Sequence, residues 1–141
     1  MALPPPARAL VDTSALLAVA HPRDQHHADA VAIGRRFLAR GGRWIGTTLV
    51  LAELHGHLLR SRGPAAARQH LRAVLEDPSY EWFGTGPDLM LDAIGHWLDR
   101  FGDQRFSLTD AVSFELMRRE KVAVAFAFDR DFRTAGFGLL T

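Results

Sequence analysis

Cysteine is absent from this 141-residue sequence, and lysine occurs only once, at position 121. The absence of cysteine excludes disulfides, thiol nucleophiles and cysteine-ligated zinc. It also fits a reducing compartment, so we expect a cytoplasmic protein. The net charge is +1, with 17 Lys and Arg against 16 Asp and Glu. The chain as a whole therefore has no polyanion-binding character.

Long apolar runs are also absent, and none approaches the roughly 20 residues that a membrane-spanning helix needs. We therefore expect no association with a membrane. Arg8 followed by the apolar residues 9–20 resembles a secretion signal. Asp12 interrupts that apolar region, however, and Pro4-Pro5-Pro6 precedes it. We interpret the segment as the beginning of a folded domain and not as a signal peptide.

Short apolar runs alternate along the chain with segments of helical periodicity and capping residues. Strands are predicted at 7–11, 44–47, 80–83 and 122–128, with an edge strand at 137–140. Helices are predicted at 15–20, 24–39, 48–59, 65–75, 87–98 and 107–120. The pattern predicts one α/β domain over residues 1–141, an α/β/α sandwich around a mostly parallel sheet. Residues 1–6 are expected to form a flexible N-terminal extension.

Two aspartates lie where predicted strands end. Asp12 follows the first strand, and Asp129 follows the strand predicted at 122–128. In open parallel sheets, functional sites form at the carboxyl ends of the strands, so these acids face one cleft if their strands are neighbours. Aspartate is also a common helix N-cap, and capping alone explains either residue equally well.

Two further acids lie in helices among apolar residues. Asp110 ends the segment Ser107-Leu108-Thr109-Asp110, which has the form of a variant capping box. It is also an acid next to the apolar residues Leu108, Ala111 and Val112, so we expect it to point towards a cleft at the beginning of its helix. Glu53 follows four apolar residues. A solvent-facing side chain is the ordinary interpretation, and a polar pocket or a metal ion is the alternative.

Four acids that met at one site would repel one another, and their pKa values would be raised. A divalent cation relieves that repulsion. Carboxylate oxygens suit Mg²⁺ or Mn²⁺ better than zinc or copper. Ions held in this way promote hydrolysis of phosphodiester bonds. The convergence of the four acids is itself a hypothesis from their places in the predicted elements.

The same residues resemble the PIN-domain nucleases, and specifically the VapC-like toxins of bacterial toxin–antitoxin pairs. The resemblance covers essentially the whole chain. It rests on four motifs in a fixed order, of which any one is weakly specific: Leu10-Val11-Asp12-Thr13-Ser14, Thr47-Thr48-Leu49-Val50-Leu51-Ala52-Glu53, Ser107-Leu108-Thr109-Asp110 and Ala127-Phe128-Asp129-Arg130-Asp131-Phe132.

The resemblance implies a Rossmann-like fold, Mg²⁺ or Mn²⁺ as cofactor, and endonucleolytic cleavage of RNA by metal-activated water. It assigns the catalytic and metal-binding roles to Asp12, Glu53, Asp110 and Asp129. Ser14 and Thr109 are implied as residues that support the acids through hydrogen bonds. Asp131 is the alternative to Asp129 as the fourth ligand. Two other roles for Asp131 are to assist Asp129 and to cap the next turn. We favour Asp129 because it comes directly off the predicted strand.

The resemblance also implies a cognate VapB-like antitoxin and a homodimer. Two alternatives remain within the family: an RNA-processing nuclease that is not a toxin, and a catalytically inactive interaction module. A phosphatase of the haloacid-dehalogenase type is a weaker alternative. Such enzymes carry a second aspartate two residues after the first, where this chain has Ser14, and Lys121 is poorly placed for the lysine that they need.

Overall fold

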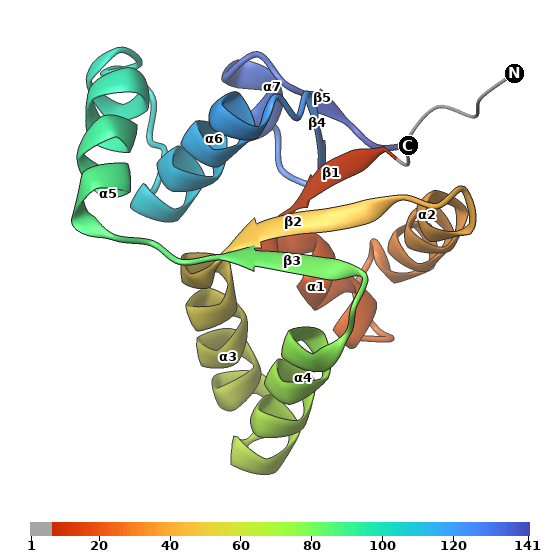
Figure 1. The fold of residues 1–141 in the computed structure, drawn as a ribbon. Coiled ribbons are helices and arrows are strands. Elements are labelled where there is room, and N and C mark those ends of the chain that lie inside the picture. The colour runs from red at the N-terminus through yellow and green to blue at the C-terminus, as the bar shows by residue number, and fades with distance from the viewer. Residues whose placement is uncertain (1–6) are drawn as a thin grey trace, which may run out of the picture.

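The computed structural model describes residues 7–141 and contains a five-stranded sheet between two layers of helices (Figure 1). Every strand pairing is parallel, which confirms the predicted α/β class. The strands lie in the order β3-β2-β1-β4-β5. Their bounds are β1 Arg8–Val11, β2 Arg43–Thr47, β3 Tyr80–Phe83, β4 Val124–Phe126 and β5 Gly138–Leu139. The extension predicted at residues 1–6 lies outside the described residues.

The helices divide by chain order between the two faces of the sheet. The first four cover one face: α1 (Thr13–Ala20), α2 (His27–Ala39), α3 (Thr48–Arg62) and α4 (Pro64–Glu76). The later ones cover the other: α5 (Pro87–Ala93), the π-helix η1 (Ile94–Asp99), α6 (Leu108–Glu120) and α7 (Asp131–Thr134). None of the helices in residues 7–141 is long and apolar enough to cross a membrane.

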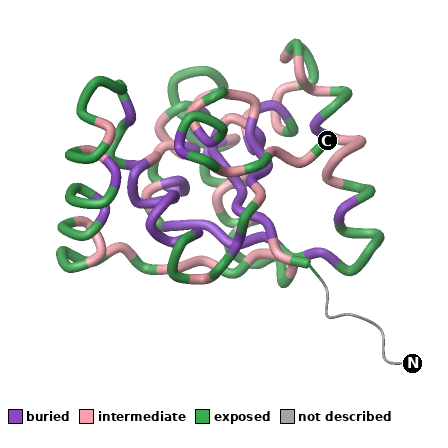
Figure 2. The backbone as a smooth tube through the Cα atoms, turned by 90° about the horizontal axis from the view of Figure 1, so that it is seen from above, coloured by how far each residue is buried: buried purple, intermediate pink, exposed green. Residues whose placement is uncertain are grey.

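The central strands are buried on both faces, which explains their unbroken apolar sequences. Successive side chains of β1 alternate between the two cores, so Leu10 packs towards α5–α7 while Ala9 and Val11 pack towards α1–α4. In β2, Ile45 and Trp44 divide in the same way. Figure 2 shows the buried residues concentrated in the middle of the molecule, with exposed residues on the outer turns of the helices.

Strand β4 is shorter than the strand predicted at 122–128, because both of its ends are used otherwise. Lys121 adopts a left-handed conformation with φ 56° as α6 ends. The N–H of Val122 donates to the carbonyl of Met117 at 2.9 Å, so the chain is still leaving the helix there. At the other end, the Phe128 N–H donates to the Ser14 hydroxyl at 3.1 Å. Asp129 therefore does not directly follow β4, which ends at Phe126, so this part of the prediction is wrong.

The helix predicted at 87–98 is also interrupted, since α5 ends at Ala93 and a π-helix follows. The wider turn brings two side chains of η1 onto one acceptor. His96 Nδ1 lies 2.9 Å and Trp97 Nε1 3.1 Å from Oε1 of Glu115, which is fully buried in α6. Arg118 and Arg119 donate to the same carboxylate. This network links η1 to α6, and it accompanies a π-turn, which is rare in helices.

Candidate active site

The strand order changes direction between β1 and β4. Strands β1, β2 and β3 extend to one edge of the sheet, while β4 and β5 lie on the other side of β1. Residues that follow β1 and β4 therefore meet at a topological switch point, where open α/β sheets form their sites. Asp12 directly follows β1, and its N–H extends the pairing to β4 by donating to the Phe126 carbonyl at 3.0 Å.

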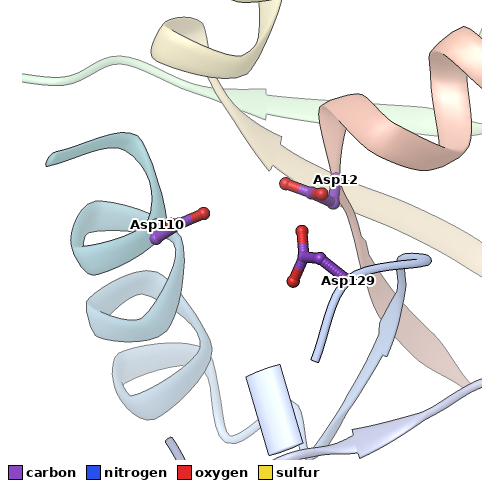
Figure 3. A group of neighbouring side chains, drawn as sticks. All are labelled: Asp12, Asp110 and Asp129. Carbon is purple, nitrogen blue, oxygen red and sulfur yellow. The ribbon is translucent and has the colours of Figure 1, made fainter. Parts of the chain in front are cut away.

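Three of the four predicted acids meet at this point (Figure 3). Asp12, Asp110 and Asp129 each place a carboxylate oxygen within 4.8 Å of one another. Asp12 is 5% exposed, and the other two are partly buried. They come from three separate segments: the end of β1, the first turn of α6 and the loop between β4 and α7. Only the fold brings them together, because their sequence separations are large.

Each of the three acids also makes a local hydrogen bond that fixes its orientation. Asp12 caps α1, and its Oδ2 accepts from the Ser14 N–H at 3.2 Å. Asp110 completes a capping box, with its Oδ2 accepting from the Ser107 N–H at 3.1 Å. Asp129 Oδ1 accepts from the Asp131 N–H at 3.0 Å. Within residues 7–141 these bonds use one oxygen of each carboxylate and leave the second one available.

The Ser14 hydroxyl links the segment that follows β1 to the segment that follows β4. Its Oγ donates to Asp12 Oδ2 at 2.6 Å and accepts from the Phe128 N–H at 3.1 Å. One side chain thus orients Asp12 and fixes the backbone that leads to Asp129. The family resemblance implies that Ser14 supports the acids, and the structure adds the second contact with the backbone of Phe128.

The electrostatics of the cluster are unfavourable without a cation. Burial is the main cause that raises the pKa of Asp12 to about 7, and the charges of Asp129 and Asp110 raise it further, against the lowering effect of the Ser14 hydrogen bonds. Burial likewise raises the pKa of Asp110 to about 6, with Asp129 adding to the effect. The pKa of Asp129 is also raised by burial. None of the salt bridges among residues 7–141 neutralises these acids.

The donor set fits a hard divalent cation. Three carboxylates without a basic partner, each with an uncommitted oxygen, match the ligands that Mg²⁺ and Mn²⁺ prefer. A cation there would favour the charged forms of these carboxylates, whose pKa values are raised mainly by burial. Asp12, Asp110 and Asp129 are accordingly the residues that would hold it.

Glu53 does not belong to this group of three. Its Oε2 accepts a hydrogen bond from the Thr13 hydroxyl at 3.0 Å, and Thr13 is 5% exposed. Thr13 is the first residue of α1, directly after Asp12, so Glu53 is linked to the site through its neighbour. Sequence reasoning missed Thr13. Its place immediately after Asp12 is the one sequence signal that bears on it, and the contact with Glu53 depends on how α1 and α3 pack.

The remaining two predicted residues are neighbours in sequence of the clustered acids. Asp131 is the first residue of α7 and donates its N–H to Asp129, while its charge raises the pKa of both Asp110 and Asp129. Thr109 is 8% exposed beside Asp110. In residues 7–141, the side chain of Thr109 makes no hydrogen bond to the three acids.

Known proteins resemble the chain in both sequence and fold. A family model described as the PIN domain matches residues 9–138. The 23S rRNA-specific endonuclease VapC20 from two strains of Mycobacterium tuberculosis is 35% identical over 69 residues, which are 49% of this chain. The matched segment spans 41% of the length of these curated relatives.

Solved structures extend the similarity over the whole fold. The crystal structure of Mycobacterium tuberculosis VapC20, described as a sarcin–ricin loop cleaving toxin, matches with a TM-score of 0.80 and 30% identity, covering 92% of this chain and 95% of that one. VapBC2 from Rickettsia felis, bound to a DNA fragment from its promoter, matches with a TM-score of 0.67 and 14% identity, covering 94% and 96%. A Pyrobaculum aerophilum protein matches with a TM-score of 0.61 and 24% identity, covering 95% and 90%. The last two similarities concern the fold alone.

Proposed function

This chain belongs to the PIN-domain family, and from that premise we propose that it is a metal-dependent endoribonuclease and the toxin of a toxin–antitoxin pair. The observation that carries the proposal is the meeting of Asp12, Asp110 and Asp129 at the switch point between β1 and β4. Three mutually repelling acids that no basic side chain of residues 7–141 neutralises are not expected in a catalytically inactive module. The cluster also differs from a phosphatase site, where a second aspartate would take the place of Ser14.

The proposed ligands of the cation are Asp12, Asp110 and Asp129, with Glu53 as a fourth. Bound Mg²⁺ or Mn²⁺ supplies positive charge for the phosphate oxygens and lowers the pKa of water. The chain's own contribution is orientation, since Ser14 holds Asp12 and the capping box holds Asp110. The carboxylate of Asp131 accepts no hydrogen bond from residues 7–141, so it is available to take the proton that an attacking water loses.

Water as the nucleophile determines the products. The 2′-hydroxyl of the RNA is not required. In the proposed reaction the bond between phosphorus and the 3′-oxygen breaks, so cleavage leaves a 5′-phosphate on one fragment and a 3′-hydroxyl on the other. The site has no histidine among its residues to act as base. His55 and His57 lie on α3 near Glu53, but neither belongs to the cluster.

The proposed substrate class is a structured loop of ribosomal RNA. VapC20 is named for cleavage of 23S rRNA and of the sarcin–ricin loop, and its structure matches this chain along almost its full length. A loop suits a site at the carboxyl ends of the strands, because bases that are not paired in a helix can be splayed apart and reached. An oligonucleotide that carries the sarcin–ricin loop is therefore the first probe.

The test is cleavage of that end-labelled oligonucleotide by the purified chain with Mn²⁺ or Mg²⁺. We expect one dominant cut, a 5′-phosphate product, and complete loss of cleavage in EDTA. Asp12→Asn and Asp110→Asn should each reduce the rate by at least about a hundredfold, because the charge that binds the cation is lost. Asp77→Asn is the matched control, since Asp77 accepts from the N–H and hydroxyl of Ser79 in the same Asp-x-Ser arrangement on the surface. Cleavage that persists in Asp12→Asn or in EDTA would exclude the proposed mechanism.

The toxin role needs a separate test in cells. Induction of the chain should arrest growth, and Asp12→Ala should abolish the arrest. Co-expression with a VapB-like antitoxin should restore growth and give a stable complex. Growth arrest that does not depend on Asp12 would count against the toxin assignment. A chain that cleaves RNA in vitro without arresting growth would indicate an RNA-processing nuclease. The proposed homodimer is tested by light scattering of the purified chain.

A further inference from the structure

Helices α1 and α3 run side by side in parallel, with a constant register. At the beginning of α1, the Thr13 hydroxyl donates to Glu53, which lies in the second turn of α3. At their ends, His21 Nε2 lies 3.4 Å from the Ser61 hydroxyl, and Arg62 Nη1 donates to the Ala20 carbonyl at 2.8 Å. Both pairs of side chains are 40 residues apart in sequence, which places equivalent positions of the two helices opposite each other. One end of this helix pair therefore meets the acidic cluster.

The opposite end of the pair carries a cavity of different charge. It has a volume of about 400 Å³ and is lined by His21, Pro22, Arg23, Ser61 and Arg62. Its lining contains two arginines, a histidine and a hydroxyl, and no acid. Asp12 and His21 are joined by one helix of nine steps, so the cavity lies about 13 Å from the acids along α1.

The two arginines keep most of their donors for a ligand. Arg23 and Arg62 are exposed, and neither forms a salt bridge within the described chain. The hydrogen bond to Ala20 uses one of the five N–H groups of Arg62 and holds its guanidinium in place. Asp24, the nearest acid in the sequence, directs its Oδ1 to the N–H of His26 instead. Arginine donors in a fixed fork match the oxygens of a phosphate.

We propose that the cavity at the end of α1 and α3 binds a backbone phosphate of the RNA whose scissile phosphate lies at the acidic cluster. The proposal rests on the ribonuclease function proposed above. An RNA strand laid along the two helices would place one phosphate among the acids and their cation and another, a few nucleotides away, between Arg23 and Arg62. The site contributes affinity and register and carries no base specificity.

The test is binding of a fluorescein-labelled sarcin–ricin loop oligonucleotide, measured by anisotropy at several salt concentrations. All proteins carry Asp12→Asn so that no cleavage occurs. Relative to that background, Arg23→Ala with Arg62→Gln should weaken binding about tenfold or more. The slope of log affinity against log salt should fall in magnitude by about 0.7, because one phosphate contact is lost. Arg72→Ala, an exposed arginine on α4, is the control and should change affinity and slope much less.

A second measurement locates the contact on the RNA. Neutral methylphosphonates are placed singly along the oligonucleotide. One position near the cut should weaken binding to the background protein about tenfold, and it should have no further effect on the double variant. Arg23→Ala alone tests the site without a risk to folding, because Arg23 makes no hydrogen bond within residues 7–141. Arg62, in contrast, donates to the Ala20 carbonyl at the end of α1.

The possible results separate this proposal from the ribonuclease function. If the double variant binds RNA with unchanged affinity and slope while the chain still cleaves it, the cavity is not a phosphate site. An acidic segment of a protein partner as the true occupant would give that same unchanged result and so would overturn the proposal. If the chain neither binds nor cleaves RNA, the ribonuclease function itself fails.

Discussion

Replacement of Asp12 by asparagine should stabilise the protein that lacks a cation, although it removes the most buried acid of the site. Burial raises the pKa of Asp12 from 3.8 to about 7. A carboxyl whose pKa is raised on folding contributes stability that is complete below its unfolded pKa and is lost as the pH rises through its folded pKa. The wild-type protein should therefore lose stability between pH 4 and pH 7.5, where Asp12 ionises in the folded state.

The size of this loss follows from the shift. About three pKa units correspond to roughly 4 kcal/mol at 1.36 kcal/mol per unit, and roughly 3 kcal/mol of it falls between pH 5 and pH 7.5. Asparagine cannot ionise, and its side-chain oxygen can still accept from the N–H and hydroxyl of Ser14. Asparagine and aspartate are comparable N-caps. Asp12→Asn should thus exceed the wild type by roughly 3 kcal/mol at pH 7.5 in EDTA and differ little from it at pH 4.

A divalent cation should remove most of this difference between the two proteins. The wild type gains about 2.7 kcal/mol when Mn²⁺ is present at a hundred times its dissociation constant. Asp12→Asn should gain much less, because one of the three converging carboxylates is neutral. Urea unfolding followed by circular dichroism at pH 4, 5 and 7.5, with EDTA or with Mn²⁺, measures all of these differences. Asp77→Asn should follow the wild type in every condition.

Two results would refute the reasoning. The first is an Asp12→Asn protein that is no more stable than the wild type at pH 7.5 in EDTA, which would mean that the ionised Asp12 is not destabilising. The second is equal stabilisation of both proteins by Mn²⁺, which would mean that the cation binds elsewhere.

Three further substitutions test Ser14 and Thr13 beside the cluster and Glu115 between η1 and α6. Ser14→Ala leaves the Phe128 N–H without its partner, so it should cost about 1–3 kcal/mol in urea unfolding. It should also raise the pKa of Asp12 above 7, moving the acid limb of the pH–rate profile to higher pH. Thr13→Val removes the donor to Glu53 and should weaken Mn²⁺ binding in calorimetry, though less than Asp12→Asn, while Thr13→Ser should restore it. Glu115→Gln should cost roughly 3 kcal/mol at pH 7. Burial raises the pKa of Glu115, but its four hydrogen-bond donors outweigh burial and lower the pKa to about 2. The resulting stability is present above pH 4.5 and is lost as the pH falls through 2.

The sequence was sufficient to predict the positions of Asp12 and Asp110. The end of a strand places Asp12 and a capping box places Asp110. Because sites in parallel sheets form at the carboxyl ends of the strands, the two side chains are expected to face the same site. Capping and clustering looked like competing interpretations in the sequence. The structure shows that they are compatible, because capping uses one carboxylate oxygen and leaves the other for the cluster.

Features that depend on packing between distant elements were not predictable in the same way. The hydrogen bond between Thr13 and Glu53 requires the parallel register of α1 and α3, which no local pattern encodes. The π-helix after Ala93 depends on Glu115, a residue from another helix. The short β4 depends on Ser14, which takes the N–H of Phe128 that a longer strand would have paired. Each of these errors arose where a side chain far away in sequence replaces a local backbone contact.

The contacts that build the site also explain why it is poised for a cation. Ser14 orients Asp12 and holds the loop to Asp129, so the fold keeps the acids close together even though their charges repel. In a flexible cluster the acids would move apart, and the affinity for a cation that needs all three carboxylates would fall. The repulsion stored between Asp12 and Asp129 is relieved when a cation binds, so part of the free energy of cation binding is prepared by folding. Substitutions that loosen Ser14 should therefore weaken cation binding even though Ser14 need not touch the ion.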